Sequence, residues 1–108
     1  MTQKIPSFIS DINNEMIDAA VHALENEKFI LGESVFKFEE EFAKYIGTKN
    51  AISVNSGSSA LHLSLLSVNI SNNSKVITST NSFIASSNAI LSTGAKPVLV
   101  DIDESDGN

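Results

Sequence analysis

The residues best suited to chemistry lie in one short run, residues 54–61, which reads VNSGSSAL. Gly57 permits a tight backbone turn after an apolar segment, and Ser58 and Ser59 fall at the start of the apolar stretch that follows. If that stretch is a helix, free N–H groups, the positive end of the helix dipole and two hydroxyls would together bind an anion such as phosphate. The same residues also fit an ordinary strand–helix turn in which a serine caps the helix.

A second candidate is Phe83, in a polar and small-residue run at 80–86 that follows another apolar segment. Ligands of open α/β sheets bind at the carboxyl ends of the strands, where Phe83 could stack on a flat ring. A core phenylalanine packed against the sheet is the alternative. Neither run is a dinucleotide fingerprint or a P-loop, because G-x-G-x-x-G and Gly-Lys-Ser/Thr are both missing.

The acidic residues near the end of the sequence form a third candidate: Asp101, Asp103, Glu104 and Asp106. Paired carboxylates can act as acid and base, but their position favours a solvated loop after a strand. His62 stands among leucines, which favours a packed core histidine over a ligand.

Composition excludes several classes of function. Thirteen acidic residues face seven lysines and no arginine, so the net charge of −6 argues against nucleic acid as a partner. The absence of cysteine excludes disulfides and a cysteine nucleophile, and two scattered histidines give no metal site. No apolar run approaches the ~20 residues of a membrane span and residues 1–10 lack a signal-peptide layout, which predicts a cytoplasmic protein without a membrane partner.

The periodicity of apolar residues predicts the elements that must position these side chains. Two amphipathic helices are expected at residues 11–26 and 34–46, the second capped by Ser34 and ended by Gly47, with a loop at 28–32 between them.

The second half predicts strands at 51–54, 75–79 and 97–100, with helices at 58–68 and 82–91 between them. Strands that alternate with helices predict an α/β fold with a parallel sheet.

Taken in order, these segments resemble the DegT-type aminotransferases, pyridoxal-phosphate enzymes that place amino groups on keto sugars attached to nucleotides. The signatures concerned are the opening segment, Gly-x-x-Val-x-x-Phe-Glu, Ser-Gly-Thr-x-Ala-Leu, Thr/Ser-Phe-x-Ala and Gly-Ala-x-Pro-Val-Phe-Val-Asp-x-Asp. They are matched by IPSF at 5–8, FILGESVFKFE at 29–39, SGSSAL at 56–61, NSFIAS at 81–86 and GAKPVLVDID at 94–103.

The resemblance implies roles for individual residues. Ser58 and Ser59 would hold the phosphate of pyridoxal 5′-phosphate, Gly57 would shape the turn, and Phe83 would stack on the pyridine ring. Ser58 stands where the family commonly has threonine, which keeps the hydroxyl and loses a methyl group.

The resemblance also implies a substrate region and a fold. Phe29 and Gly32 would lie near the sugar. The fold would be an incomplete fold-type-I PLP-transferase large domain: a helical segment at 1–48 with two helices, then the start of the α/β PLP-binding domain at 49–108, in the order β-α-β-α-β.

Family members are several times longer, and their Schiff-base lysine and the Asp that pairs with the pyridine nitrogen both lie downstream of the matching segment. None of the seven lysines here occupies a segment similar to the lysine site, so no catalytic residue is assigned. We therefore expect an N-terminal fragment, inactive alone, of a homodimeric enzyme of polysaccharide biosynthesis. That enzyme would transfer an amino group from glutamate to a nucleotide-linked keto sugar.

Two alternatives stay open. Some relatives replace that lysine with histidine and dehydrate the sugar, so the parent could be a PLP-dependent sugar dehydratase. The chain could also be a small α/β domain that binds a phosphorylated ligand without catalysis.

Overall fold

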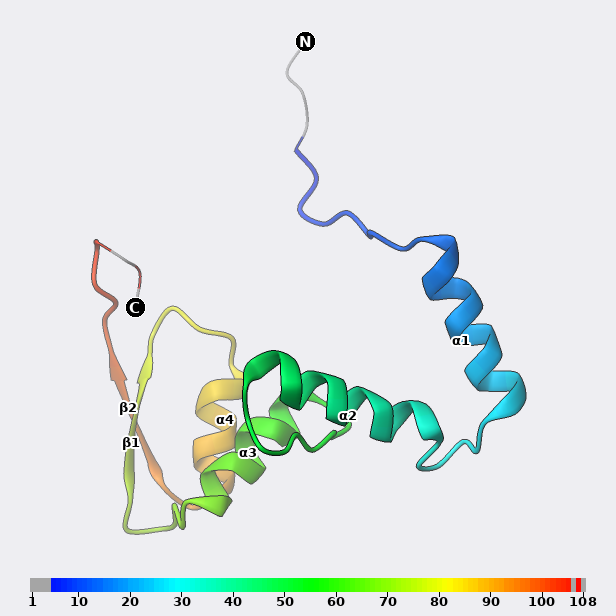
Figure 1. Cartoon of the computed structure of the whole chain (residues 1–108). Helices are drawn as coiled ribbons and strands as arrows, with labels where there is room; N and C mark the ends of the chain where they lie inside the picture. Colours follow the sequence, from blue (N-terminus) through cyan, green and yellow to red (C-terminus); the bar gives the residue numbers. More distant parts are fainter. Residues whose placement is uncertain (1–4, 106, 108) are drawn as a thin grey trace. The chain divides into compact units, whose positions relative to one another are not determined.

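The computed structural model describes residues 5–105 and 107. Along the chain the elements are α1 (Asn14–Asn26), α2 (Glu33–Ile46), α3 (Gly57–Ser67), β1 (Lys75–Ser79), α4 (Ala85–Ser92) and β2 (Lys96–Val100) (Figure 1). They fall into two compact units, Met1–Ser53 and Val54–Asn108, which we call the N-terminal and C-terminal units.

The N-terminal unit consists of α1 and α2. Helix α1 begins three residues later than predicted because Asn13 supplies the cap, its side chain accepting a hydrogen bond from the Met16 N–H at 2.9 Å. Helix α2 ends at Gly47, as predicted, where the left-handed φ of 79° favours glycine. The predicted cap at Ser34 is wrong: Gly32 occupies the N-cap position and Ser34 is the second residue of the helix.

Most apolar side chains of α1 and α2 are exposed, and within the described part of these helices only Ala43 is buried. Each helix has an apolar stripe, and in the described part of the chain most of that stripe is exposed. No helix in the described ranges is both long and apolar enough to span a bilayer.

The C-terminal unit is built around a β1–α4–β2 arrangement. The two strands are parallel, in a register that runs from Lys75 beside Lys96 to Ser79 beside Val100. Helix α4 packs against both strands, and α3 packs against α4. The buried side chains of this unit come from α4 and the turn after it: Ala89, Ile90, Thr93 and Ala95.

The predicted strand at 51–54 is wrong, so the observed order after α2 is α-β-α-β. A strand needs a neighbour for its backbone hydrogen bonds, and the sheet described here pairs β1 with β2 alone. The N–H of Ser53 is satisfied instead by Glu39 Oε1 at 2.6 Å, and Ile52 remains 84% exposed. The alternation of apolar residues is present at 51–54, but the pairing partner is not.

The other elements of this unit match their predictions closely. Strand β1 has the predicted bounds, while α3 and β2 each differ by one residue. Helix α4 starts three residues after the predicted position, because Phe83 and Ile84 form a turn whose carbonyls accept the first helical hydrogen bonds. Gly94, with φ of 81°, lies just past its end.

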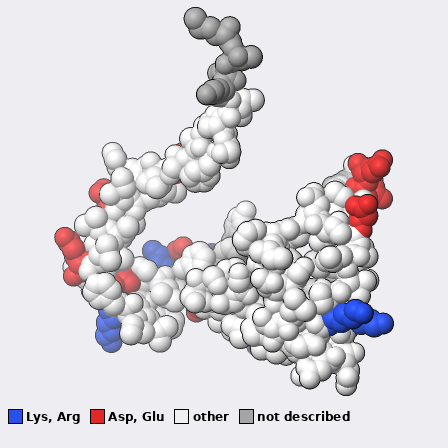
Figure 2. Space-filling view, turned by 180° about the vertical axis from the view of Figure 1, so that it is seen from behind, with Lys and Arg blue, Asp and Glu red and all other residues white. Residues whose placement is uncertain are grey.

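Charge is separated along the sheet. Lys75 and Lys96 begin the two strands, whereas Asp101, Asp103 and Glu104 follow the end of β2. Figure 2 shows acidic and basic groups well apart on this unit, with mostly uncharged surface between them.

Candidate functional site

The N-terminus of α3 presents unpaired hydrogen-bond donors. Ser56 caps the helix: its Oγ accepts from the Ser59 N–H at 3.1 Å, and its carbonyl accepts from the Ala60 N–H at 3.0 Å. Within the described chain, the N–H groups of Gly57 and Ser58 have no such partner. Two backbone donors at the positive end of the helix dipole therefore remain available to an anion.

A short polar network surrounds this cap. Ser56 Oγ donates to Ser59 Oγ at 3.0 Å, and Ser59 Oγ donates to Asn55 Oδ1 at 2.7 Å. The Ser58 hydroxyl takes no part in it. The prediction that Ser58 and Ser59 open the helix is confirmed, and the structure adds Asn55 and Ser56 as the residues that shape its end.

Gly57 does not form the tight backbone turn that was expected. It is the first residue of α3, and its φ lies outside the left-handed region. A Cβ at this position would meet no atom within 4 Å. The space beside the Gly57 Cα is therefore open, and turn geometry does not require a glycine here.

A pocket of about 300 Å³ lies between the first two turns of α3 and α4 with the turn before it. Ser58, Ser59 and Phe83 all line it, so the structure brings these three predicted site residues together, whereas Gly57 is not part of the lining. Phe83 is 77% exposed and is therefore not the core residue of the alternative interpretation. His62, expected to be packed in a core, is half-buried and also lines the pocket.

The pocket suits a phosphorylated aromatic ligand in its chemistry. Its polar lining comes from Ser58 and Ser59 in the first turn of α3 and from His62, Asn88 and Ser92, and Phe83 offers an aromatic face. The lining contains no lysine, so the favourable field for an anion comes from the helix terminus. These features fit pyridoxal phosphate held by its phosphate and its ring.

Phe29 and Gly32 line a different pocket, of about 230 Å³, within the N-terminal unit. Phe29 is 90% exposed in the loop between α1 and α2. A Cβ on Gly32 would come within 2.5 Å of Glu27 Oε2 and 2.9 Å of the Lys28 carbonyl oxygen, so this glycine is required by close packing.

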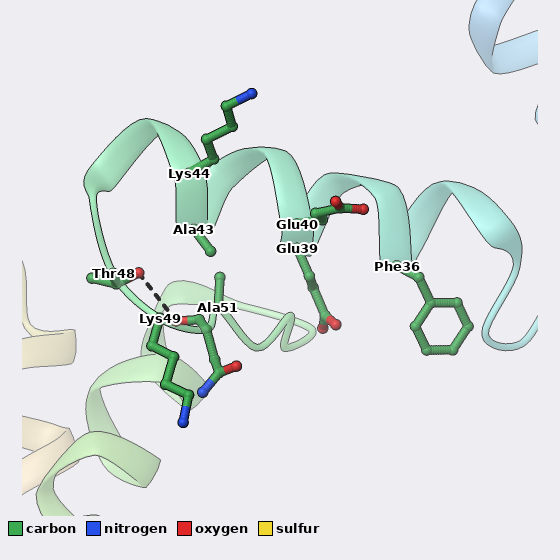
Figure 3. Close-up of a pocket in the computed structure, with 9 residues that line it drawn as sticks. Phe36, Glu39, Glu40, Ala43, Lys44, Thr48, Lys49 and Ala51 are labelled. Carbon is green, nitrogen blue, oxygen red and sulfur yellow. Dashed lines mark hydrogen bonds between the residues drawn. The ribbon is translucent and has the colours of Figure 1, made fainter.

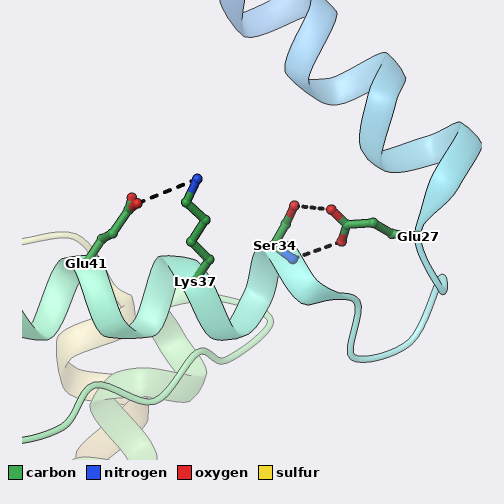
Figure 4. A network of polar contacts seen from close by, with 4 residues as sticks. All are labelled: Glu27, Ser34, Lys37 and Glu41. Carbon is green, nitrogen blue, oxygen red and sulfur yellow. Dashed lines mark hydrogen bonds and ion pairs between the residues drawn. The ribbon is translucent and has the colours of Figure 1, made fainter.

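One carboxylate fastens that loop. Glu27 Oε2 accepts from the Ser34 N–H at 2.9 Å and Glu27 Oε1 accepts from the Ser34 hydroxyl (Figure 4). The hydrogen bond from the Ser34 hydroxyl, followed by that from its N–H, lowers the pKa of Glu27 below 4.5. Lys37 and Glu41 form an ion pair at 3.8 Å one turn further along α2, at an exposed position where such pairs contribute little. We call the Glu27–Ser34 contact the carboxylate clasp.

Another hollow in the N-terminal unit, of about 410 Å³, lies between α2 and the segment after it (Figure 3). The Thr48 hydroxyl donates to the Asn50 carbonyl at its edge, and the Glu39 carboxylate is occupied by the Ser53 N–H. None of the predicted site residues lines it, and we assign it no function.

The acidic residues after β2 behave as a loop. Asp103 Oδ1 accepts from the N–H and hydroxyl of Ser105, and these contacts, the hydroxyl first, lower the pKa of Asp103 below 3.8. A self-contained turn of this kind agrees with the interpretation as a solvated loop. Asp106, the remaining member of the group, lies outside the described residues.

Comparison with known proteins identifies the family. Residues 10–108 match the DegT/DnrJ/EryC1/StrS aminotransferase family. This chain belongs to that family. It is 43% identical over 100 residues to an uncharacterized protein of Methanocaldococcus jannaschii, a match that covers 93% of this chain and 26% of the relative. It is 33% identical to a dTDP-3-amino-3,4,6-trideoxy-alpha-D-glucose transaminase of Micromonospora megalomicea, covering 98% of this chain and 29% of that enzyme.

Solved structures confirm the predicted α/β fold class. DesV of S. venezuelae matches with a TM-score of 0.77 and 39% identity over 83% of this chain and 24% of its own. The PLP form of Spr1654 from Streptococcus pneumoniae matches with a TM-score of 0.85 and 29% identity, over 94% of this chain and 26% of its own. The family's aminotransferases depend on pyridoxal phosphate, so the predicted cofactor of the family is also confirmed.

The chain spans about a quarter of the length of the curated relatives it matches: 26%, 26% and 20% for the first three. The family and fold are therefore established for these residues, whereas the activity of a whole enzyme is a matter for proposal.

Two functional contacts escaped sequence reasoning. Asn55 and Ser56 were not predicted as site residues, although serine is among the residue types preferred at a helix N-cap. The carboxylate clasp joins residues seven apart across a loop, and no local pattern announces such a contact.

Proposed function

We propose that these residues form the phosphate-binding and ring-stacking part of a PLP-dependent aminotransferase that acts on a nucleotide-linked keto sugar. The observation that carries the proposal is the pocket that Ser58, Ser59 and Phe83 line together, at a helix whose first two N–H groups, those of Gly57 and Ser58, have no hydrogen-bond partner within the described chain. Family membership supports the choice of cofactor and reaction. When bound, pyridoxal phosphate supplies an aldehyde that accepts and passes on an amino group, together with an electron-withdrawing ring.

In this proposal each residue has a positional task. The N–H groups of Gly57 and Ser58 and the Ser58 hydroxyl bind phosphate oxygens, and Ser59 supports that end of the helix. Phe83 covers one face of the pyridine ring and excludes water from it. Phe29 and Gly32, on the loop held by the carboxylate clasp, contact the sugar substrate.

The proposal extends to the whole enzyme. It would take its amino group from glutamate and act as a homodimer in the cytoplasm. Named relatives include a GDP-perosamine synthase of Caulobacter vibrioides, 44% identical over 73 residues, covering 68% of this chain and 20% of that enzyme. The division into a helical segment at 1–48 and a PLP-binding domain from residue 49 likewise stays a proposal.

The covalent step of an aminotransferase needs a lysine amine, and none of the seven lysines here resembles the family's site. We therefore expect this chain by itself to bind pyridoxal phosphate weakly and without a covalent bond, and to have no transaminase activity.

Titration of the ¹⁵N-labelled chain with pyridoxal phosphate tests the proposal. Amide signals of Gly57, Ser58 and residues 83–85 should shift together, and Phe83→Leu should weaken binding several-fold by removing the aromatic face. Phe8→Leu, a change at a side chain that is 82% exposed and outside the pocket, is the matched control. Unmoved signals at Gly57 and Ser58 would reject the proposal. A single lysine labelled after borohydride reduction would contradict non-covalent binding.

A further inference from the structure

The three serines at the start of α3 have one hydroxyl hydrogen each, and the structure commits two of them. Ser56 gives its hydrogen to Ser59 Oγ at 3.0 Å, and Ser59 gives its own to Asn55 Oδ1 at 2.7 Å. Within the described part of the chain, the Ser58 hydroxyl has no protein partner. The serines are therefore not equivalent as donors to a ligand.

The backbone N–H groups divide in the same way. Those of Ser59 and Ala60 are satisfied by the Oγ and carbonyl oxygen of Ser56. Those of Gly57 and Ser58 remain, and apart from the adjoining residues and the backbone of the helix no atom lies within 4 Å of where a Gly57 Cβ would be. The unpaired donors thus sit on two adjacent residues that face open space.

We infer that Asn55 is a positioning residue that separates the roles of the two serines. By accepting the hydroxyl hydrogen of Ser59 it commits Ser59 to the helix cap, and the anion is left to the N–H groups of Gly57 and Ser58 and the Ser58 hydroxyl. This inference rests on the proposed function, since the anion concerned is the cofactor's phosphate.

An asparagine suits this task better than an aspartate. The amide oxygen accepts the Ser59 hydrogen as well as a carboxylate would, but it brings no negative charge toward a bound phosphate. The position therefore requires an acceptor that is neutral.

The experiment uses the full 108-residue chain and inorganic phosphate as the probe, followed by amide chemical shifts. Ser58→Ala should weaken phosphate binding roughly tenfold, because it removes a hydrogen bond to a charged group. Ser59→Ala, the matched change one residue along, should alter the affinity less than about twofold, since its hydrogen already belongs to Asn55. Equal losses in the two variants would overturn the inference.

Variants of Asn55 separate positioning from general support of the fold. Asn55→Ala frees the Ser59 hydrogen, so phosphate affinity should hold or rise, and Ser59→Ala should now weaken binding in that background. Asn55→Asp should retain the Ser59 contact and still weaken phosphate binding by repulsion. A purely structural Asn55 predicts the opposite: Asn55→Ala alone would reduce affinity, and Ser59→Ala would add nothing to it.

A measurement without ligand keeps the two proposals distinguishable. In phosphate-free solution the Ser59 amide should exchange with solvent more slowly than those of Gly57 and Ser58, because it alone donates to Ser56 Oγ. Fast exchange at Ser59 would overturn the inference even if phosphate binds. A protected Ser59 with no phosphate response would reject the proposed function while supporting the commitment of Ser59 to the cap.

Discussion

The first turns of α2 and α3 differ in how their N–H groups are hydrogen-bonded. Each helix starts with N–H groups that lack helical partners. In the N-terminal unit the carboxylate of Glu27, which precedes α2 in the chain, accepts hydrogen bonds from both the N–H and the hydroxyl of Ser34. In the C-terminal unit α3 is capped by the neutral Ser56, and the N–H groups of Gly57 and Ser58 stay unpaired.

The difference teaches which helix end can serve as a binding site. The start of α2 already has an anion from its own chain, so its donors contribute to the shape of a loop. The start of α3 has the donors without the anion, and the space in front of Gly57 is open. The glycines differ in the same way. A Cβ on Gly32 would clash with Glu27 and Lys28, whereas a Cβ on Gly57 would meet no atom outside its own helix and neighbours within 4 Å.

The largest effect is expected from removing core packing on α4, the helix against which α3 packs. Ile90 is 3% exposed on that helix. Ile90→Ala should lower the free energy of unfolding of the C-terminal unit by about 2–4 kcal/mol, through lost burial and a cavity. Chemical denaturation followed by amide signals measures this. Leu91→Ala, at a neighbour that is 56% exposed, is the control and should cost much less. Equal losses would show that α4 does not form the core described.

A methyl group added at Gly32, just before α2, should lower the stability of that loop. In Gly32→Ala the new Cβ would lie 2.9 Å from the Lys28 carbonyl oxygen and 2.5 Å from Glu27 Oε2, so the carboxylate clasp must open. We expect a local loss of about 1–3 kcal/mol from overpacking. It should appear as faster amide exchange at Ser34 and in the first turn of α2. Unchanged exchange at Ser34 would mean that the clasp is not maintained in solution.

The same substitution at Gly57, at the start of α3, should raise stability and not lower it. Gly57→Ala meets no atom within 4 Å beyond its neighbours and the helix backbone, and it replaces glycine at the first position of a helix, which should stabilise α3 by less than about 1 kcal/mol. The methyl group should nevertheless obstruct the unpaired N–H groups and weaken phosphate binding. Helix stability and phosphate affinity measured on the same samples separate the two effects. Tighter phosphate binding in this variant would contradict an access role for Gly57.

The smallest effect is expected from lowering the pH, which protonates the Glu27 carboxylate. The contacts with Ser34 lower the pKa of Glu27 below 4.5, so the folded state favours the ionised carboxylate. The stabilisation is therefore fully present above pH 4.5 and is lost as pH falls through the lowered pKa. The Ser34 amide shift should follow this titration, and in Glu27→Gln it should not. The amides of Gly57 and Ser58 should stay unaffected in the same range, because no carboxylate caps them.

Local patterns predicted most of these elements. The bounds of β1 are correct, those of α3 and β2 differ by one residue, and Gly47 ends its helix as expected, because periodicity and glycine stops are encoded in neighbouring residues. The strand at 51–54 was wrong because a strand depends on a partner from elsewhere in the chain, and Glu39 took its Ser53 N–H instead.

In the candidate site, too, residue types could be predicted from the sequence, but contacts between residues could not. Ser58, Ser59 and Phe83 could be selected by residue type and by position after apolar segments, and the pocket unites them. Gly57 was selected for a conformation that it does not adopt. The hydroxyl directions that distinguish Ser58 from Ser59 could not be predicted, because they depend on where Asn55 and Ser56 place their oxygens.

A single phosphate titration of the unmodified chain tests the contrast between the two helix ends most directly. Amide shifts are recorded in one experiment at the start of α3, for Gly57 and Ser58, and at the start of α2, for Glu33 and Ser34. We expect saturable shifts at Gly57 and Ser58, and none at Ser34, whose N–H and hydroxyl the Glu27 carboxylate already binds, or at the adjacent acidic Glu33. Equal responses at both ends, or a response at α2 alone, would contradict the account.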